Sequence, residues 1–377
     1  MTHSIVNKSG APTTILLAGD LILDLPNPGH WLSGVAPAIR KADVAIGHLE
    51  VPHTSSTVEL KGDVPAPGAP VDNLAALAEA GFTAVTMAGN HIADCGAQGI
   101  ADTIAELDRL GIAYCGAGET LQEATRPAVI HAGGRIIKLL SYNCVGPEAS
   151  WAGDDRAGCA FLRIETEDGS PIAPAAPLSR MADEAAQTLA RDIAAARVGA
   201  DLVIVALHKG LVHRPATLAP YERAVAQAAI DAGADVVAGH HAHIVQGIEF
   251  YRGKPIFHGL GNGCVVTNAL SPDQDHAVRA EWARKRKALF GFEPDPAYLV
   301  APFHPEAVNA MMAELIWEQD GRIDVRIIPV HVEPPGRPVL ADAKRGAEIL
   351  DYLESITEES GLPPVALRAH IMKGADI

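Results

Sequence analysis

Short runs of apolar and β-branched residues recur along the chain, and alanine-rich segments with helical spacing separate them. The first kind includes "TTILLAGD", "ADVAIGHLE", "GFTAVTMAGNH", "RIIKLLSYN", "ADLVIVALHKG" and "ADVVAGHH"; the second includes "VDNLAALAEAG" and "IADTIAELDRLG". Such runs predict buried strands, and apolar residues at 3.6-residue spacing predict amphipathic helices. Their alternation predicts an α/β protein with a mostly parallel sheet covered by helices.

The chain after residue 265 has a different pattern. "HAVRAEWARKRKALFG" predicts a helix, and we interpret its basic run as a solvated face rather than a nucleic-acid patch. "AVNAMMAELIWEQDGRIDVRIIPVHVE" predicts a hairpin that turns at "QDGR", and "LADAKRGAEILDYLESITEESG" predicts an amphipathic helix. We find no internal repeat or low-complexity linker, so we expect a single domain over 1–377, with a core of about 12–265 and a C-terminal elaboration of about 266–377.

Polar residues follow almost every predicted strand. In open α/β sheets ligands bind beyond the carboxyl ends of the strands, so we expect these residues to converge. Divalent transition metals prefer imidazole nitrogen and carboxylate oxygen, and two adjacent ions need about six to eight such ligands. The candidates are Asp20, Glu50, Asn90, His91, His208, His240, His241 and His243.

Composition narrows the class of protein. The chain has 377 residues, 48% of them hydrophobic, which is enough for a large core. A formal net charge of -16 disfavours nucleic acid, anionic membranes and polyanionic substrates, unless a metal reverses the local field. The N-terminus lacks a signal-peptide pattern and no apolar run approaches the roughly 18 residues of a membrane span, so we expect a soluble, cytoplasmic protein. The five cysteines are scattered without CxxC spacing, which predicts reduced, buried thiols.

Several of these motifs together resemble one family. "AGD" at 18–20, "GHLEVP" at 47–52, "MAGNHIADCGAQGIADTIAELDRLGI" at 87–112, "LHKG" at 207–210 and "GADVVAGHHAHIVQGIEFYRGKPIFHGLGN" at 233–262 are similar to the CapA family, named for capsule and poly-γ-glutamate synthesis. That family belongs to the calcineurin-like metallophosphoesterases. The resemblance implies a four-layer αββα sandwich with a C-terminal hairpin and helix, and a dinuclear centre of divalent Mn, Fe or Zn at the strand ends.

The resemblance also implies a role for each matching residue. Asp20 would bind one metal, and Glu50 would bridge the two. The second metal would take Asn90 and His208, and each metal would take one of the pair His241 and His243. His91 would be the general acid for the leaving group or a donor to an anionic intermediate. His240 occupies an inserted or substituted position, and would be an alternative ligand or support the others.

This chain departs from related patterns at three positions. Ile22 stands where ordinary calcineurin-like enzymes have a histidine, a lack that most of the CapA family shares, and this leaves the first site short of ligands. His48 replaces an asparagine, and it either restores a nitrogen ligand or faces the substrate. Lys209 stands where the family usually has tryptophan, and it suggests an anionic substrate group. Further candidates for binding negative charge are His213, Arg214 and Lys61.

Three functions are compatible with these residues. The first is metal-dependent hydrolysis of a phosphoester or amide bond, including a γ-glutamyl or peptide-like bond, in a small anionic substrate, with metal-activated water and His91 as acid. The second is epimerisation or isomerisation by proton abstraction beside a metal-polarised carbonyl. The third is a non-catalytic accessory role in capsule or polyglutamate synthesis. The nearly complete ligand set favours an enzyme over the third.

Overall fold

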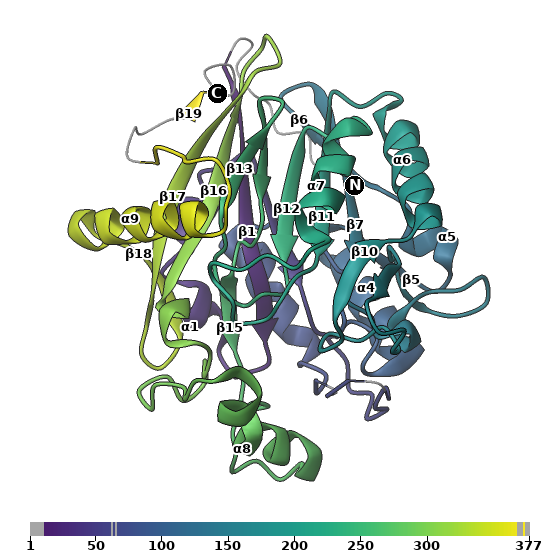
Figure 1. Ribbon diagram of the computed structural model, residues 1–377, viewed down its shortest axis with the longest axis vertical. Helices are drawn as coiled ribbons and strands as arrows, with labels where there is room; N and C mark the ends of the chain where they lie inside the picture. The colour runs from purple at the N-terminus through teal and green to yellow at the C-terminus, as the bar shows by residue number, and fades with distance from the viewer. Residues whose placement is uncertain (1–10, 62, 65, 368–371, 374–377) are drawn as a thin grey trace.

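The computed structural model describes residues 11–61, 63–64, 66–367 and 372–373 and contains two large sheets (Figure 1). The first sheet has the order β18-β17-β16-β1-β2-β3-β4, with β15 beside β1 and β19 beside β17. Its strands are β1 (Thr13–Leu23), β2 (Val44–Leu49), β3 (Ala84–Thr86), β4 (Ala113–Cys115), β15 (Asn262–Val266), β16 (Asn309–Trp317), β17 (Ile323–Glu333), β18 (Arg337–Leu340) and β19 (Met372–Lys373).

The second large sheet has the order β13-β14-β12-β11-β7-β6. Its strands are β6 (Ala128–Ala132), β7 (Arg135–Asn143), β11 (Leu202–His208), β12 (Val236–His240), β13 (Ile248–Tyr251) and β14 (Lys254–Phe257). Two short antiparallel pairs accompany the sheets: β5 (Ala117–Gly118) with β8 (Gly158–Cys159), and β9 (Ile164–Thr166) with β10 (Leu178–Met181).

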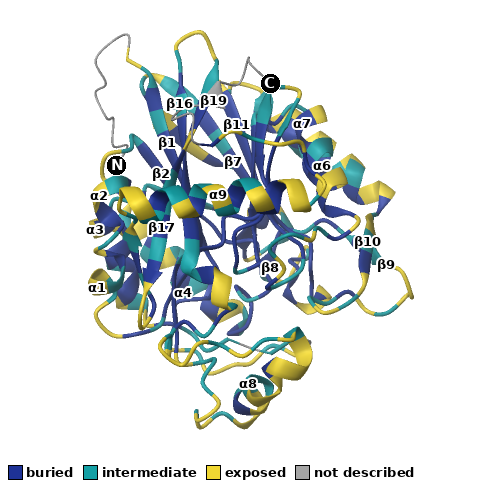
Figure 2. Ribbon diagram, turned by 60° about the vertical axis from the view of Figure 1, so that its left-hand side comes forward, coloured by how far each residue is buried: buried dark blue, intermediate teal, exposed yellow. Residues whose placement is uncertain are grey.

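Helices cover the outer faces of both sheets. The helices are α1 (Pro28–Leu32), α2 (Ala36–Ile39), α3 (Ala75–Ala80), α4 (Gly96–Leu110), α5 (Leu121–Ala124), α6 (Asp183–Arg197), α7 (Glu222–Asp231), α8 (Ala277–Phe290) and α9 (Ala343–Glu359), with 3₁₀ turns η1 (Val71–Leu74), η2 (Glu148–Ser150) and η3 (Pro305–Val308). Helix α9 packs on β17 and β13, which belong to different sheets, and α8 lies apart from the sheets at one end of the molecule (Figures 1 and 2).

Neighbouring residues of β1 show how the layers form. Ile15 and Leu17 pack in the core between the two sheets together with Leu139 of β7 and Ile204 of β11, whereas Leu16 packs in the core on the helix side. Both faces of the strand are therefore buried, and the arrangement is the expected four-layer αββα sandwich. The expectation of one mostly parallel sheet is wrong, because the strands divide into two. A continuous apolar run shows that both faces are covered, but not what covers them.

The C-terminal predictions are confirmed. Strands β16 and β17 form the expected hairpin, with Trp317 opposite Ile323, and β16 pairs antiparallel with β1, so the hairpin extends the first sheet. The two helices predicted after residue 265 correspond to α8 and α9. All five cysteines are buried and free. Among the described residues no helix is long and apolar enough to cross a membrane; most of the N-terminal segment considered above, residues 1–10, lies outside the described residues.

Parallel strands of both sheets bring their carboxyl ends to one place. Strands β1 to β4 are parallel in the first sheet, and β7, β11, β12 and β14 are parallel in the second. Gly19 of β1 lies directly against Gly261, and the neighbouring Asp20 amide donates to the Gly261 carbonyl at 2.9 Å. The strand changes register on both sides of Asp20, against β2 and against β15. Such bulges redirect a side chain.

The contact at Gly19 leads to a first prediction. A Cβ atom at Gly19 would lie 1.9 Å from the Gly261 carbonyl oxygen, so Gly19→Ala would force two backbone segments apart. Overpacking costs about 1–3 kcal/mol, and we expect the free energy of unfolding in urea to fall by about that amount. Gly29→Ala is the matched control, because Gly29 is exposed and the nearest atom to its added Cβ is 4.0 Å away. Equal stability of the two variants would contradict this packing.

Candidate metal centre

The histidine-rich loop after β12 has an unusual backbone. His241 and His243 have φ angles of 89° and 53°, in the left-handed region that non-glycine residues rarely adopt. Residues held in this region cluster at functional sites, where surrounding structure compensates their cost. This turn brings the His241 amide to Asp20 of β1, and the amide donates to Asp20 Oδ2 at 3.3 Å.

A first group of ligand atoms combines both sheets. Asp20, His48 and His208 each offer one atom within 4.8 Å of the others. The His48 ring stacks on His240 at 4.7 Å, and its Nδ1 lies 2.9 Å from the Thr86 hydroxyl, which leaves Nε2 without a partner. His48 is buried and absent from the cavity wall described below. This geometry favours the ligand alternative for His48 over a contact with substrate.

A second group contains Asp20, Glu50 and His243. His243 Nε2 lies 3.2 Å from Glu50 Oε1, and its Nδ1 lies 2.9 Å from the Asn262 side-chain oxygen and 3.6 Å from Asp20 Oδ2. Asp20 belongs to both groups, whereas Glu50 belongs to this one only. Asp20 is thus the residue that the two groups share, and the bridging role expected for Glu50 stays a prediction.

Asn90 and His241 add two more atoms beside His208. His208 Nε2 lies 2.7 Å from Asn90 Oδ1 and 3.1 Å from His241 Nδ1. The Asn90 amide nitrogen donates to Asp63 at 2.9 Å, which turns the amide oxygen toward the histidines. Separations of about 3 Å are those between ligands that share one ion at 2.0–2.2 Å.

The buried polar atoms of this cluster lack hydrogen-bond partners. Asp20 and Glu50 are both 0% exposed. Buried charges are normally paired or bind metals, and an orphaned buried polar atom is costly. The described residues provide no hydrogen bond for Asp20 Oδ1, Glu50 Oε1 and Oε2, His48 Nε2, His208 Nδ1, His240 Nδ1 or His241 Nε2. Oxygen and imidazole donors in this number fit one or two divalent transition-metal ions.

The electrostatics of three of the imidazoles agree with ligation, and His243 is the exception. Burial, followed by the neighbouring histidines, lowers the pKa of His48 to about 3 and that of His208 well below its usual value. Burial likewise lowers the pKa of His241 to about 3. For His243 burial opposes protonation, but Glu50 and Asp20 outweigh it and raise the pKa to about 9. Neutral imidazole is the form that binds metal.

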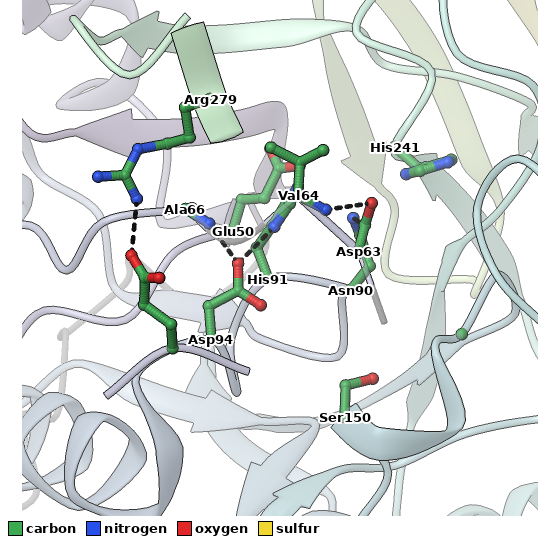
Figure 3. Close-up of polar contacts among 12 residues, drawn as sticks. Glu50, Asp63, Val64, Ala66, Asn90, His91, Asp94, Ser150, His241 and Arg279 are labelled. Carbon is green, nitrogen blue, oxygen red and sulfur yellow. Dashed lines mark hydrogen bonds and ion pairs between the residues drawn. The ribbon is translucent and has the colours of Figure 1, made fainter. Parts of the chain in front are cut away.

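His91 is held differently from the other histidines. Its Nδ1 lies 2.7 Å from Asp94 Oδ2, and the same oxygen accepts the Ala66 amide at 2.6 Å (Figure 3). Burial disfavours the protonated ring, but the Asp94 carboxylate outweighs it and raises the pKa of His91 to about 10. The side chain is 20% exposed and lines the cavity. His91 is therefore a protonated imidazole with access to a bound molecule.

A cavity of about 200 Å³ lies beside the cluster. Its floor includes Glu50, Asn90, His91, His241 and His243, and its roof is built from α8 and the segment around Phe303. The remaining wall is largely apolar, with Ile22, Val51, Val64, Ala66, Pro67, Pro174, Ala175, Val212, Leu270 and Pro302. The position of Ile22, where a further ligand was expected to be missing, is thus part of this wall.

The predicted anion-binding residues do not gather at this cavity. Lys209 is 0% exposed and pairs with Glu222 at 2.7 Å and the His258 carbonyl at 3.0 Å, so the expected substrate contact of Lys209 is wrong. Successive strand residues face opposite ways, and His208 takes the side toward the site. Arg214 and Lys61 are exposed and absent from the wall.

His213 does line the cavity, but as part of an aromatic group. Its ring packs edge-on against Phe290 and Phe292, with ring centroids 4.9 Å and 5.0 Å apart. The centroid of the His243 ring lies 6.2 Å away. His240 lies with its Nδ1 3.2 Å from Asp20 Oδ1. His240 is thus a candidate ligand, and His213 is a wall residue beside the candidate ligand His243.

Sequence reasoning missed the residues that orient the ligands. Asp63, Asp94 and Asn262 hold Asn90, His91 and His243, respectively. The His91–Asp94 spacing in "HIAD" and the Asn262 that ends "GLGN" were visible signals. The sequence of α8 is rich in aromatic and basic residues, but nothing else in it indicated that this helix lines the cavity.

The buried Lys209–Glu222 pair gives a second prediction. Lys209→Met leaves Glu222 as a buried charge without its ion-pair partner. We therefore expect the free energy of unfolding in urea to fall by about 3–5 kcal/mol. Adding Glu222→Gln should recover part of the loss. The control is Lys285→Met, which removes an exposed pair with Glu281 (3.0 Å) and should leave the free energy of unfolding almost unchanged, because solvent screens the pair. Unchanged stability of Lys209→Met would mean that the lysine is not paired in this way.

The chain is similar in sequence to bacterial proteins of capsule and polyglutamine synthesis. Residues 14–265, about two thirds of the chain, match the family described as "Bacterial capsule synthesis protein PGA_cap". The "Probable polyglutamine synthesis accessory protein Rv0574c" of Mycobacterium tuberculosis is 34% identical over 64% of this chain and 61% of that protein. The "Capsule biosynthesis protein CapA" of Bacillus anthracis is 28% identical over 68% of this chain and 61% of that protein. The chain thus spans about three fifths of the length of these relatives.

Solved structures are more distant. The "calcineurin-like phosphoesterase YfkN from Bacillus subtilis" is 11% identical, covering 93% of this chain and 99% of that chain, with a TM-score of 0.34. The "GAP50 the anchor in the inner membrane complex of Plasmodium" is 9% identical, covering 94% and 98%, with a TM-score of 0.35. Neither likeness is close enough to indicate function. From the sequence match the chain belongs to the PGA_cap family of bacterial capsule synthesis proteins.

Proposed function

We propose that the protein is a metal-dependent hydrolase of a phosphoester or amide bond in an anionic substrate. The observation that carries this proposal is a buried cluster of carboxylate and imidazole groups, several of whose atoms have no hydrogen bond, beside a cavity that His91 also lines. The Asp94 carboxylate outweighs burial and raises the pKa of His91, which favours the protonated ring. A purely structural role gives no reason to bury two carboxylates beside imidazole nitrogens that lack hydrogen bonds. A hydrolytic centre requires both the metal ligands and an acid.

The ligands would divide into two sets that share Asp20. One set would be Asp20 with His48 and His208, joined by Asn90 and His241; the other would be Asp20 with Glu50 and His243. Divalent ions of Mn, Fe or Zn suit such donors. When bound, these ions lower the pKa of water and polarise a phosphoryl or carbonyl oxygen.

His91 would protonate the leaving group. Asp94 accepts from Nδ1 and so fixes the ring, which leaves the proton on Nε2 for transfer. Asp94 is itself held by the Ala66 amide, and this contact keeps the carboxylate in place as the imidazole loses charge. Positioned acids of this kind contribute about 10²–10⁴-fold to rate.

The names of the relatives bear on the bond that is cut. Two of them are named for polyglutamine synthesis as accessory proteins and two for capsule or PGA biosynthesis as CapA. A γ-glutamyl or related amide is therefore one candidate bond, and a phosphoester is the other. Both are covered by the same experiment.

We expect His91→Gln to reduce hydrolysis in proportion to the need of the leaving group for a proton. With Mn²⁺ supplied, kcat/KM should fall by about 10²–10⁴-fold for an alkyl phosphate or a γ-glutamyl alkylamide. It should fall much less for p-nitrophenyl phosphate, because p-nitrophenolate leaves without a proton. His131→Gln, an exposed histidine on β6, is the control and should have no effect. Asp20→Asn should abolish hydrolysis of every substrate.

Two outcomes would contradict the proposal. One is the absence of hydrolysis of both substrate classes with Mn²⁺, Fe²⁺ or Zn²⁺ supplied. The other is incorporation of deuterium from heavy water into an amide substrate without cleavage, which would indicate epimerisation instead. An equal effect of His91→Gln on good and poor leaving groups would remove His91 as the acid.

A further inference from the structure

Helix α8 presents one face to the cavity. Arg279, Trp282, Arg286 and Phe290 follow i, i+3, i+7, i+11 spacing, and all four line the cavity wall. The opposite face is exposed, and Figure 2 shows α8 with an exposed outer surface. The interpretation of the whole basic run as a solvated face is therefore wrong at Arg286. This residue is 3% exposed.

Arg286 is a buried cation without a counter-charge. Its guanidinium donates to the carbonyls of Pro302 at 2.5 Å and Leu270 at 3.2 Å, and its Nε has no partner. No carboxylate in the described part of the chain forms an ion pair with it, and burial alone lowers its pKa to about 10. Burying a charge in this way is unfavourable unless an anion joins it.

Arg279, the second arginine on this face of α8, has an acidic partner. Arg279 donates to Glu59 at 3.4 Å and to Gln274 at 3.0 Å, and Figure 3 shows it directed to a carboxylate. Arg279 is therefore neutralised within the protein. Of the two cavity arginines on α8, Arg286 is the one that lacks an acidic partner among the described residues.

The surroundings of Arg286 are apolar and aromatic. Its Cζ lies 5.1 Å from the Trp282 ring, and Phe303 packs on His243 at 5.0 Å, so the aromatic wall reaches the candidate metal ligands. Carboxylates also line the cavity, at Asp24 and Asp63 besides Glu50. These would repel a second negative charge on a ligand.

We propose that the cavity binds a substrate whose non-reacting part is apolar or aromatic and carries a single carboxylate or phosphate, with Arg286 as the receptor for that anion. This inference rests on the proposed function only in calling the bound molecule a substrate. The binding of the anion by Arg286 does not depend on hydrolysis. A guanidinium holds such oxyanions through two parallel hydrogen bonds. The mostly apolar wall disfavours a polyanionic segment, such as consecutive glutamates, at this position.

The test compares two small probes that differ only in charge. For 3-phenylpropionate and its neutral amide, dissociation constants are measured by ligand-detected NMR with the full chain. We expect the wild type to bind the carboxylate roughly tenfold or more tightly. In Arg286→Met this preference should fall to about one, with the amide still bound, while Arg284→Met on the exposed face should keep it. Glutarate, an aliphatic dianion, should bind more weakly than 3-phenylpropionate in the wild type.

Each alternative result has a defined meaning. No preference in the wild type, a preference that survives Arg286→Met, or tighter binding of glutarate would overturn the inference. If Arg286→Met binds neither probe, Arg286→Gln decides by the same criterion. In Asp20→Asn the preference should persist; its loss there would assign the anion to the metal ions and overturn the inference without touching the hydrolase proposal. A preserved preference without any hydrolysis would leave the inference standing and overturn the proposed function.

Discussion

The burial of two carboxylates among several imidazoles, where the two sheets meet, is the constraint on which the rest of this structure depends. Asp20 and Glu50 have no exposed surface. Burial lowers the pKa of His48 and of His241 to about 3, whereas the pKa of His243, beside both carboxylates, is raised to about 9. An arrangement of this kind is unfavourable by several kcal/mol unless a cation occupies it. The left-handed backbone of His241 and His243 is a further unfavourable feature that the same cluster requires. The close approach of Gly19 to Gly261 is possible because Gly19 has no Cβ atom.

Around this cluster, neutral and acidic residues fix the direction of three of the candidate ligands. Thr86 holds His48, Asp63 holds the Asn90 amide, and Asn262 holds His243. Partners of this kind set the tautomer and orientation of metal-ligating groups. The cavity continues outward from the cluster to α8, so a single path connects the candidate metals, His91 and the buried guanidinium of Arg286.

Local patterns predicted much of this arrangement. Period and length identified most of the strands and the long helices, and the polar residues at the strand ends identified the residues that gather at the cluster. Strand alternation would also have shown that Lys209 faces away from His208, because neighbouring residues of a strand lie on opposite faces. The membership of Asp20 in both candidate groups depends on the bulge in β1 and on the meeting of two sheets, neither of which leaves a local signal. The same holds for Arg286, whose burial depends on where α8 docks.

The central claim is that the buried cluster binds metal ions. The most direct measurement is anomalous diffraction at the manganese edge from crystals of the full chain grown with Mn²⁺. We predict two anomalous peaks, one within ligand distance of His48 or His208 and the other within ligand distance of Glu50 and His243, with Asp20 in contact with both. The absence of any peak at Asp20 under saturating Mn²⁺, with Zn²⁺ and Fe²⁺ also failing at their own edges, would contradict the account.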